Sequence, residues 1–94
     1  MRNLEFSGIN ISGQGLKQLA ELISKSKNLK SLTLEWNYLN DFPDEFDYFC
    51  DVIATCHHLT YLYLKNNKLN TNLARGSLTK ILKTNEGMLY LGNV

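Results

Sequence analysis

The segment LKSLTLEWNYL, from Leu29 to Leu39, returns thirty residues later as LTYLYLKNNKL, from Leu59 to Leu69. Both segments have the pattern LxxLxLxxNxL, in which x is any residue. Leucines that alternate with other residues predict a short β-strand with one buried face. An asparagine follows, at a point where a strand ordinarily stops. The pattern indicates a chain built from a repeated structural unit.

A degenerate copy and a partial copy flank these two segments. The first copy holds Met1, Leu4, Phe6, Ile9 and Ile11 in the five pattern positions, and the last holds Met88 and Leu91. The strand leucines of the four copies, at positions 4, 32, 62 and 91, are separated by 28, 30 and 29 residues. We therefore divide a single domain, 1–94, into repeats of about 1–28, 29–58 and 59–87 and a partial repeat 88–94. Because Ile9 replaces the asparagine, the first repeat is expected to be a terminal unit.

The second half of each repeat changes from a period of 2 to a period of about 3.6, which predicts a helix. The apolar residues with this spacing are Leu16, Leu19, Leu22 and Ile23; Phe46, Phe49, Val52, Ile53 and Cys56; and Leu78, Ile81 and Leu82. Pro43 suits a first helical turn, so we expect a helix over 44–56 with Asp41 or Asn40 as its cap. Each repeat thus reads as strand, turn, helix and loop.

No such unit can bury its apolar face alone, so successive units are expected to stack. The sequence resembles the ribonuclease-inhibitor-like class of leucine-rich repeats, whose units of about 28 residues carry true helices. The resemblance implies an α/β leucine-rich-repeat solenoid, a short right-handed β-α superhelix with parallel strands on its concave face and helices on its convex face. At the end of each strand, the amides of Asn37 and Asn67 are expected to be buried and to satisfy backbone groups of the turn and the neighbouring repeat.

Composition argues against several classes of partner. The chain is 44% hydrophobic and 20% charged, with a formal charge of +1, so no broad attraction to nucleic acid or anionic lipid is expected. The basic cluster Lys25, Lys27 and Lys30 is interpreted as a solvated turn. No apolar run approaches the ~20 residues needed to span a bilayer, and the N-terminus lacks the apolar stretch of a signal peptide. We expect no membrane contact and a cytoplasmic location.

The two cysteines, Cys50 and Cys56, precede His57 and His58, but this spacing matches no familiar zinc motif. On one helix the two cysteines would lie about 240° apart, so we interpret them as buried thiols and the histidines as the end of the helix. The acidic residues around position 44 do not have EF-hand spacing. No nucleophile with a base, no carboxylate pair and no phosphate loop is recognisable. We expect no metal, no cofactor and no enzymatic activity.

Candidate binding residues lie between the strand leucines, because those positions face the concave side. The partner-binding candidates are Thr33, Glu35, Trp36, Tyr61, Tyr63, Lys65 and Tyr90. Exposed aromatic side chains on a rigid sheet are typical of protein-binding hot spots, although cross-strand packing that only stabilises the sheet explains them equally well. Glu35 and Lys65 occupy the same position of adjacent repeats, which predicts a modest surface salt bridge.

A narrower resemblance is carried by SLTLEWN at 31–37, the pair Phe49 and Cys50, LTYLYLKNNKL at 59–69 and LKTNEGMLYL at 82–91. These stretches are similar to the N-terminal repeats of the family of leucine-rich-repeat-containing protein 45. That family joins such repeats to a long coiled coil and is associated with the centrosome linker, basal bodies and early cilium assembly. The present sequence has no coiled-coil segment, and Asn93 stands where the last strand should offer an apolar residue. We expect a fragment or a short family member, with end strands open to self-association.

The leading hypothesis is therefore a non-enzymatic scaffold that docks an unidentified protein in a centrosomal, basal-body or ciliary assembly. An alternative is a sensor or regulatory fragment, as in the repeats of innate-immune-type receptors or actin regulators. A phosphate-binding loop upstream would favour the sensor, whereas heptads downstream would favour the scaffold.

Overall fold

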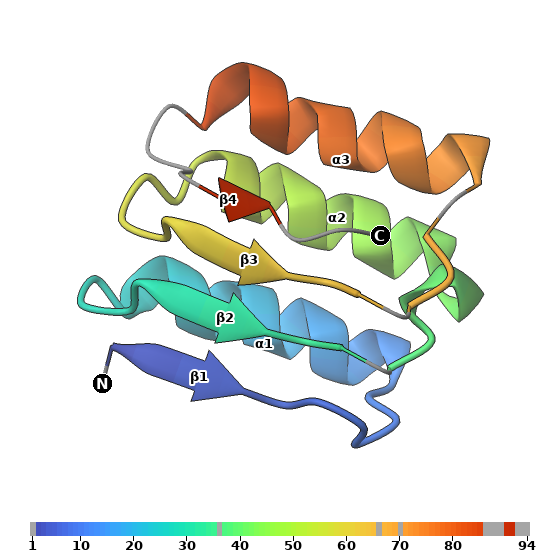
Figure 1. Cartoon of the computed structure of the whole chain (residues 1–94), viewed down its shortest axis with the longest axis horizontal. Coiled ribbons are helices and arrows are strands. Elements are labelled where there is room, and N and C mark those ends of the chain that lie inside the picture. The colour runs from blue at the N-terminus through green and yellow to red at the C-terminus, as the bar shows by residue number, and fades with distance from the viewer. Residues whose placement is uncertain (1, 36, 66, 70, 86–89, 92–94) are drawn as a thin grey trace.

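The computed structural model describes the whole chain except residues 1, 36, 66, 70, 86–89 and 92–94 (Figure 1). Strands and helices alternate along it. The elements are β1 (Asn3–Glu5), α1 (Gly13–Lys25), β2 (Ser31–Thr33), the 3-10 helix η1 (Leu39–Asp41), α2 (Pro43–Ala54), β3 (Tyr61–Tyr63), α3 (Asn72–Thr84) and β4 (Tyr90–Leu91). In the described part of the chain, no helix is both long and apolar enough to span a bilayer.

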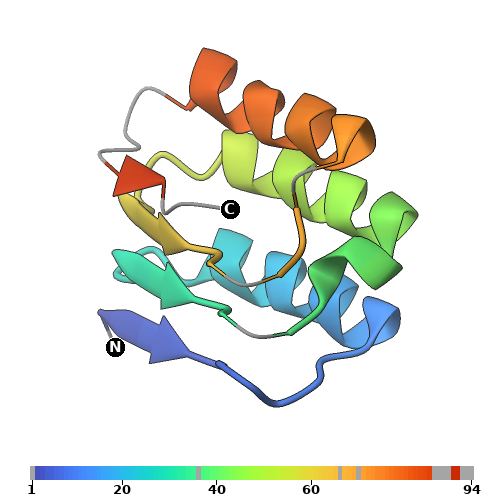
Figure 2. The same ribbon diagram turned by 45° about the vertical axis from the view of Figure 1, so that its right-hand side comes forward.

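The strands form one parallel sheet in the order β1-β2-β3-β4, the order in which they occur along the chain. Leu4 pairs with Leu32, Leu32 with Leu62, and Leu62 with Leu91, so the repeat spacing predicted the strand register correctly. Figures 1 and 2 show the helices side by side on one face of this sheet, which leaves the other face open. The predicted mixed α/β class with parallel strands is confirmed.

The core lies between the sheet and the helices. The strand leucines Leu32 and Leu62 have no exposed surface, and the rings of Phe46 and Phe49 stack with their centroids 6.3 Å apart on the inner face of α2. Two residues of the predicted apolar helix faces, Leu22 and Leu82, are instead 51% and 64% exposed. The buried faces of α1, α2 and α3 follow i, i+3, i+4 and i+7 from Leu16, Phe46 and Ala74, and Leu22 and Leu82 fall outside these series.

Side chains of the next repeat satisfy the carbonyl groups at the ends of the first two helices. His58 Nε2 lies 3.0 Å from the carbonyl oxygen of Ile23, and the amide of Asn85 donates to the carbonyl oxygens of Ile53 and Cys56 at 2.8 and 3.1 Å. The expectation that the histidines end α2 is therefore wrong: α2 ends at Ala54, and His58 contacts the end of α1. The helix termini are tied across repeats, which holds the helices in register with the strands.

Two of the three α-helices begin at a residue whose side chain caps the first turn. Ser12 accepts from the N–H of Gly15, and Thr71 accepts from the N–H of Ala74, as side-chain caps do. The cap of α2 is Phe42, which makes no side-chain bond, so the prediction of Asp41 or Asn40 is wrong. Those two residues belong to η1, which ends before the cap position of α2.

The two asparagines of the repeat pattern form a ladder of hydrogen bonds at the ends of the strands. Asn67 Oδ1 accepts from the N–H of Asn37 at 2.7 Å, and Asn37 Oδ1 accepts from the N–H of Ile9 at 3.1 Å. The amide of Asn67 donates to the carbonyl oxygens of Leu34 and Leu64 at 2.7 and 3.0 Å. Both asparagine side chains are fully buried, as predicted. The exposed Ile9 ends the ladder, since it supplies only a backbone donor.

A left-handed residue follows the ladder position in each of the three full repeats. Asn10, Tyr38 and Lys68 have φ of 54°, 53° and 57°. This conformation costs non-glycine residues about 1–2 kcal/mol and persists where surrounding contacts fix the backbone. The ladder bonds supply that restraint at Asn10 and Tyr38, because the N–H groups immediately before and after each of these residues donate to one asparagine side chain of the next repeat.

We expect Asn67→Ala to lower the free energy of unfolding by about 3 kcal/mol or more, because buried groups that lose their partners cost ~1–3 kcal/mol each. Urea unfolding followed by circular dichroism measures the change. Asn28→Ala, at an exposed turn position, is the matched control and should stay within about 0.5 kcal/mol of the parent chain. Equal losses in the two variants would contradict the structural role of the ladder.

Candidate functional site

The open face of the sheet carries three of the seven binding residues predicted from the sequence. Tyr61 is 38% exposed, Thr33 and Tyr63 are half-buried, and Lys65 is exposed. Tyr61 pairs with Ser31 on one side and with Tyr90 on the other, and Thr33 pairs with Tyr63. Trp36 and the side chain of Tyr90 lie outside the described residues. The structure thus brings Thr33, Tyr61 and Tyr63 together on adjacent strands.

The predicted salt bridge between Glu35 and Lys65 is absent: the ion pairs found among the described residues both involve Lys80. Glu35 and Lys65 lie in the turns that follow β2 and β3, which end at Thr33 and Tyr63. Strand pairing therefore does not hold the two charged side chains opposite each other. They remain separate charges at the rim of the open face.

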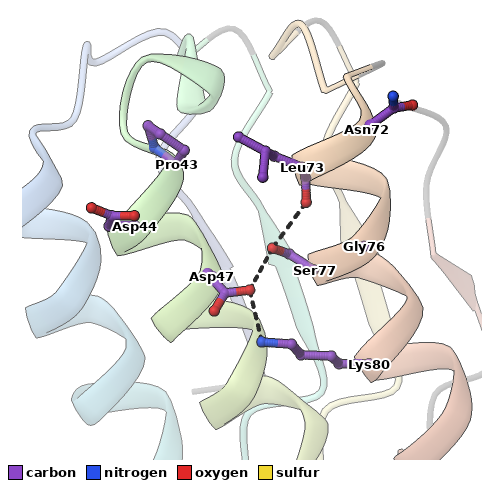
Figure 3. Close-up of a pocket in the computed structure, with 8 residues that line it drawn as sticks. All are labelled: Pro43, Asp44, Asp47, Asn72, Leu73, Gly76, Ser77 and Lys80. Atoms are coloured by element: carbon purple, nitrogen blue, oxygen red, sulfur yellow. Dashed lines mark hydrogen bonds and ion pairs between the residues drawn. The ribbon is translucent and has the colours of Figure 1, made fainter.

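A second surface, which the sequence did not predict, is a groove between α2 and α3 (Figure 3). It has a volume of about 480 Å³. Pro43 and Leu73 lie across from each other near the start of the two helices (Figure 3), and Gly76 of α3 also lines the groove. Asp44, Asp47 and Lys80 supply the charged part of its lining. We call this surface the α2–α3 groove.

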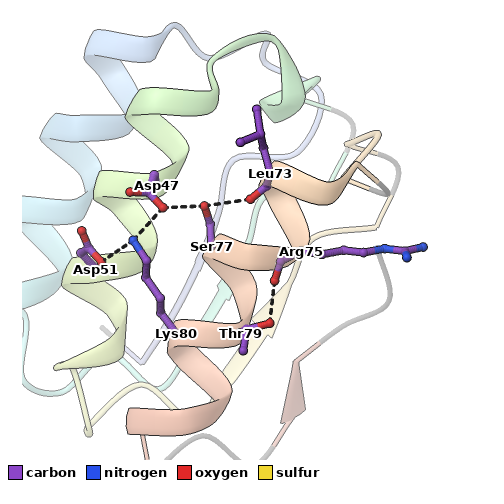
Figure 4. Close-up of polar contacts among 7 residues, drawn as sticks. All are labelled: Asp47, Asp51, Leu73, Arg75, Ser77, Thr79 and Lys80. Atoms are coloured by element: carbon purple, nitrogen blue, oxygen red, sulfur yellow. Dashed lines mark hydrogen bonds and ion pairs between the residues drawn. The ribbon is translucent and has the colours of Figure 1, made fainter.

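Lys80 joins the two helices at the lower end of the groove (Figure 4). Its Nζ lies 2.7 Å from Asp47 Oδ1 and 2.9 Å from Asp51 Oδ1. The hydroxyl of Ser77 donates to Asp47 Oδ1 at 2.6 Å. Hydrogen bonds from Lys80 and then Ser77 hold the pKa of Asp47 below its ordinary value, and the bonds to both carboxylates raise the pKa of Lys80. These contacts stabilise the charged forms of Asp47 and Lys80.

The remaining charges leave the groove acidic. Asp44 has no ion pair with any described residue, and Lys80 is shared between two carboxylates. Arg75 extends away from the groove on the opposite side of α3, so it does not balance these charges (Figure 4). Asp44 and Glu45 lie in the first turn of α2, where the helix dipole favours negative charge.

The cysteines do not form a site. Cys50 and Cys56 are both buried, and both are free thiols. Burial raises the pKa of each thiol, and Asp47 adds to the effect at Cys50. Reactive thiols have a lowered pKa and some exposure, so the interpretation of these residues as structural is supported. Across the described residues, no three histidine, cysteine or acidic side chains come together in a way that fits a metal ion.

The edge of the molecule beside β1 is apolar. A shallow cavity of about 220 Å³ is lined there by Phe6, Ile9, Ile11 and Leu22, among others. Ile9 and Leu22 are each more than half exposed. β1 is also an edge strand of the sheet, with a partner on one side only. We call this surface the β1 edge.

Comparison with known proteins supports the resemblance to leucine-rich repeat proteins. No protein-family model matches the chain, and no solved structure matches it significantly. The chain is similar to leucine-rich repeat-containing protein 45 of Gallus gallus, with 34% identity over 83 residues. That region covers 88% of this chain but 12% of the relative, so the chain spans only a small part of that protein's length.

We expect Asp47→Asn to lower the free energy of unfolding at pH 7 by at most about 1 kcal/mol, since Asp47 is exposed enough for solvent to screen its ion pair. Because folding lowers the pKa of Asp47, its contribution is present above its unfolded pKa and is lost as the pH falls through the folded value. The parent and variant should therefore converge as the pH falls below about 3.8, the ordinary value. Urea titrations from pH 7 to pH 2 measure this. Asp41→Asn, which removes an exposed carboxylate outside the Lys80 ion pairs, is the control variant.

Proposed function

We propose that the chain is a segment of a leucine-rich-repeat solenoid and that it binds a protein partner through the open face of the sheet. The concave curvature of that face and the absence of catalytic activity are parts of the same proposal. The main support is the position of the exposed Tyr61 and the half-buried Thr33 and Tyr63 on adjacent parallel strands. Tyrosine supplies a large contact area at low entropic cost, and parallel strands hold it rigidly.

Two other observations support a binding role. The similarity to a leucine-rich repeat-containing protein favours an interaction module, because the ordered layers of such repeats present an extended surface to other proteins. The described cysteines are buried, and burial makes their thiols weak nucleophiles, which argues against a thiol enzyme. By the family resemblance of the sequence, we place the binding event in the cytoplasm, in a centrosomal, basal-body or ciliary assembly.

The sheet-face proposal is tested by replacing Trp36, Tyr61 and Tyr63 together with serine. We expect recovery of partners from an extract of ciliated cells, measured by quantitative mass spectrometry, to fall at least tenfold, because aromatic anchors carry most of the energy of such interfaces. Tyr48→Ser is the matched control: Tyr48 is 37% exposed, nearly as much as Tyr61, but lies on α2. Unchanged recovery by a folded triple variant would exclude the sheet face as the binding surface.

Self-association through the end strands is a second candidate, and the apolar β1 edge favours it. An edge strand with free backbone groups and adjacent apolar side chains can pair with a second copy of the chain. Leu22→Glu places a charge on this surface and should therefore raise the dissociation constant for self-association at least fivefold. Sedimentation velocity over a hundredfold concentration range measures the shift. Leu82→Glu is the control, because Leu82 is 64% exposed on α3 and lines neither the β1 edge nor the α2–α3 groove, and an equal effect there would contradict association through the β1 edge.

A further inference from the structure

The α2–α3 groove is lined at one position by a glycine, where the preceding repeat carries a large side chain. Helices α2 and α3 bury equivalent residues in the same order: Phe46, Phe49, Cys50 and Ile53 correspond to Ala74, Ser77, Leu78 and Ile81. This correspondence pairs Tyr48 of α2 with Gly76 of α3. Each of these two residues lies on the side of its helix that faces the preceding helix. A tyrosine in one repeat is therefore replaced by a hydrogen atom in the next.

We call the line of contact between two neighbouring helices a seam. In the seam between α1 and α2, the space that corresponds to the α2–α3 groove is filled by side chains. Lys17 of α1 lies over the ring of Tyr48, with Nζ 5.4 Å from the ring centroid. A Cβ atom placed on Gly13 would come within 2.9 Å of Glu45 Cδ, so the seam is also closed near the start of the helices. By contrast, a Cβ atom on Gly76 would have no atom of another element within 4 Å. The first seam is filled, and the second is open.

Nothing in the described fold requires glycine at position 76. Gly76 has no positive φ, unlike Gly8, and no close neighbour excludes a side chain. Glycine inside a helix is less favourable than alanine, because it loses more backbone entropy on folding. Its effect here is to keep a hollow of about 480 Å³ accessible from solvent. That volume is within the range of small ligand sites.

We propose that the α2–α3 groove binds a short peptide segment of another protein, with an aromatic side chain over Gly76 and a neighbouring basic side chain at Asp44. The aromatic ring would occupy the position that Tyr48 fills one repeat earlier. The basic residue is favoured because Asp44 has no ion pair among the described residues and Lys80 is already bound to two carboxylates. Pro43 and Leu73, which is 72% exposed, provide the apolar walls.

The dimensions set the length of the segment. From Leu73 to Lys80 the groove follows seven residues of α3, which is about 10 Å at ~1.5 Å per residue. An extended chain advances ~3.3 Å per residue, so three or four residues fill the groove. This surface lies on the helical side of the molecule, opposite the open sheet face, so it is a second interaction surface that is independent of the first (Figure 2).

The test uses a random twelve-residue peptide library displayed on phage. Phage that bind the variant Gly76→Tyr, which carries the tyrosine of the preceding repeat, are first removed from the library. The remaining phage are then selected for binding to the parent chain. We expect the enriched peptides to pair an aromatic residue with arginine or lysine. In fluorescence anisotropy, a labelled synthetic copy should bind Gly76→Tyr at least tenfold more weakly than the parent. Gly76→Ala is the matched control: it should bind within about threefold of the parent and unfold at a higher urea concentration.

Two further variants separate the outcomes. Asp44→Asn should weaken binding about twofold to fivefold, as expected for an exposed ion pair, whereas Tyr61→Ser on the open sheet face should leave it unchanged. The proposal is overturned if no peptide survives the depletion, or if the selected peptides bind the parent and Gly76→Tyr equally. It is also overturned if Gly76→Tyr converts a self-associated parent chain to monomer in sedimentation velocity, since a second copy would then be the occupant.

Discussion

The hydrogen bond from the N–H of Asn37 to the side chain of Asn67 is the contact on which the arrangement of repeats depends. It joins two turns that lie thirty residues apart in sequence, and the same amide of Asn67 binds the carbonyl oxygens of both repeats. A buried amide with four partners fixes the distance and the register between neighbouring strands. The left-handed residue after each ladder position and the parallel pairing of the leucines both follow from that restraint.

This restraint acts on the strand side only, which explains why the two faces of the molecule differ. The strands are held in equivalent positions, so the open face repeats regularly from β1 to β4. The helix seams instead depend on the side chains that each pair of helices happens to bring together. Tyr48 and Lys17 close one seam, whereas Gly76 leaves the other open. The same repeated architecture therefore has a regular open sheet face on one side and an irregular groove between two helices on the other.

The parts of the fold that were predictable from the sequence are those with a strict period. The leucine spacing predicted the strand register, and Asn37 and Asn67 were placed correctly in the core because a buried amide has a clear physical role at a turn. The exposure of Leu22 and Leu82 was not predicted, since apolar spacing alone does not distinguish the side of a helix that faces the sheet from its flank. Predicting the α2–α3 groove required a comparison between Tyr48 and Gly76. The repeat pattern does not align these two residues, because the strand leucines of their repeats are offset by 30 positions, whereas the buried residues of α2 and α3 are offset by 28. A glycine within a helix of good helix formers was the only signal of it in the sequence.

The strands are three residues long where they are longest, and this limits how strongly the open face can bind. Four strands about 4.8 Å apart span about 14 Å, and three residues extend about 10 Å, so the face matches the diameter of one α-helix. Stable protein interfaces bury ~800 Å² on each partner, which is more than so small a face provides. Contacts made here alone should form and dissociate quickly. Tight association then requires further contacts outside this face, which act together with it and slow the dissociation of the complex.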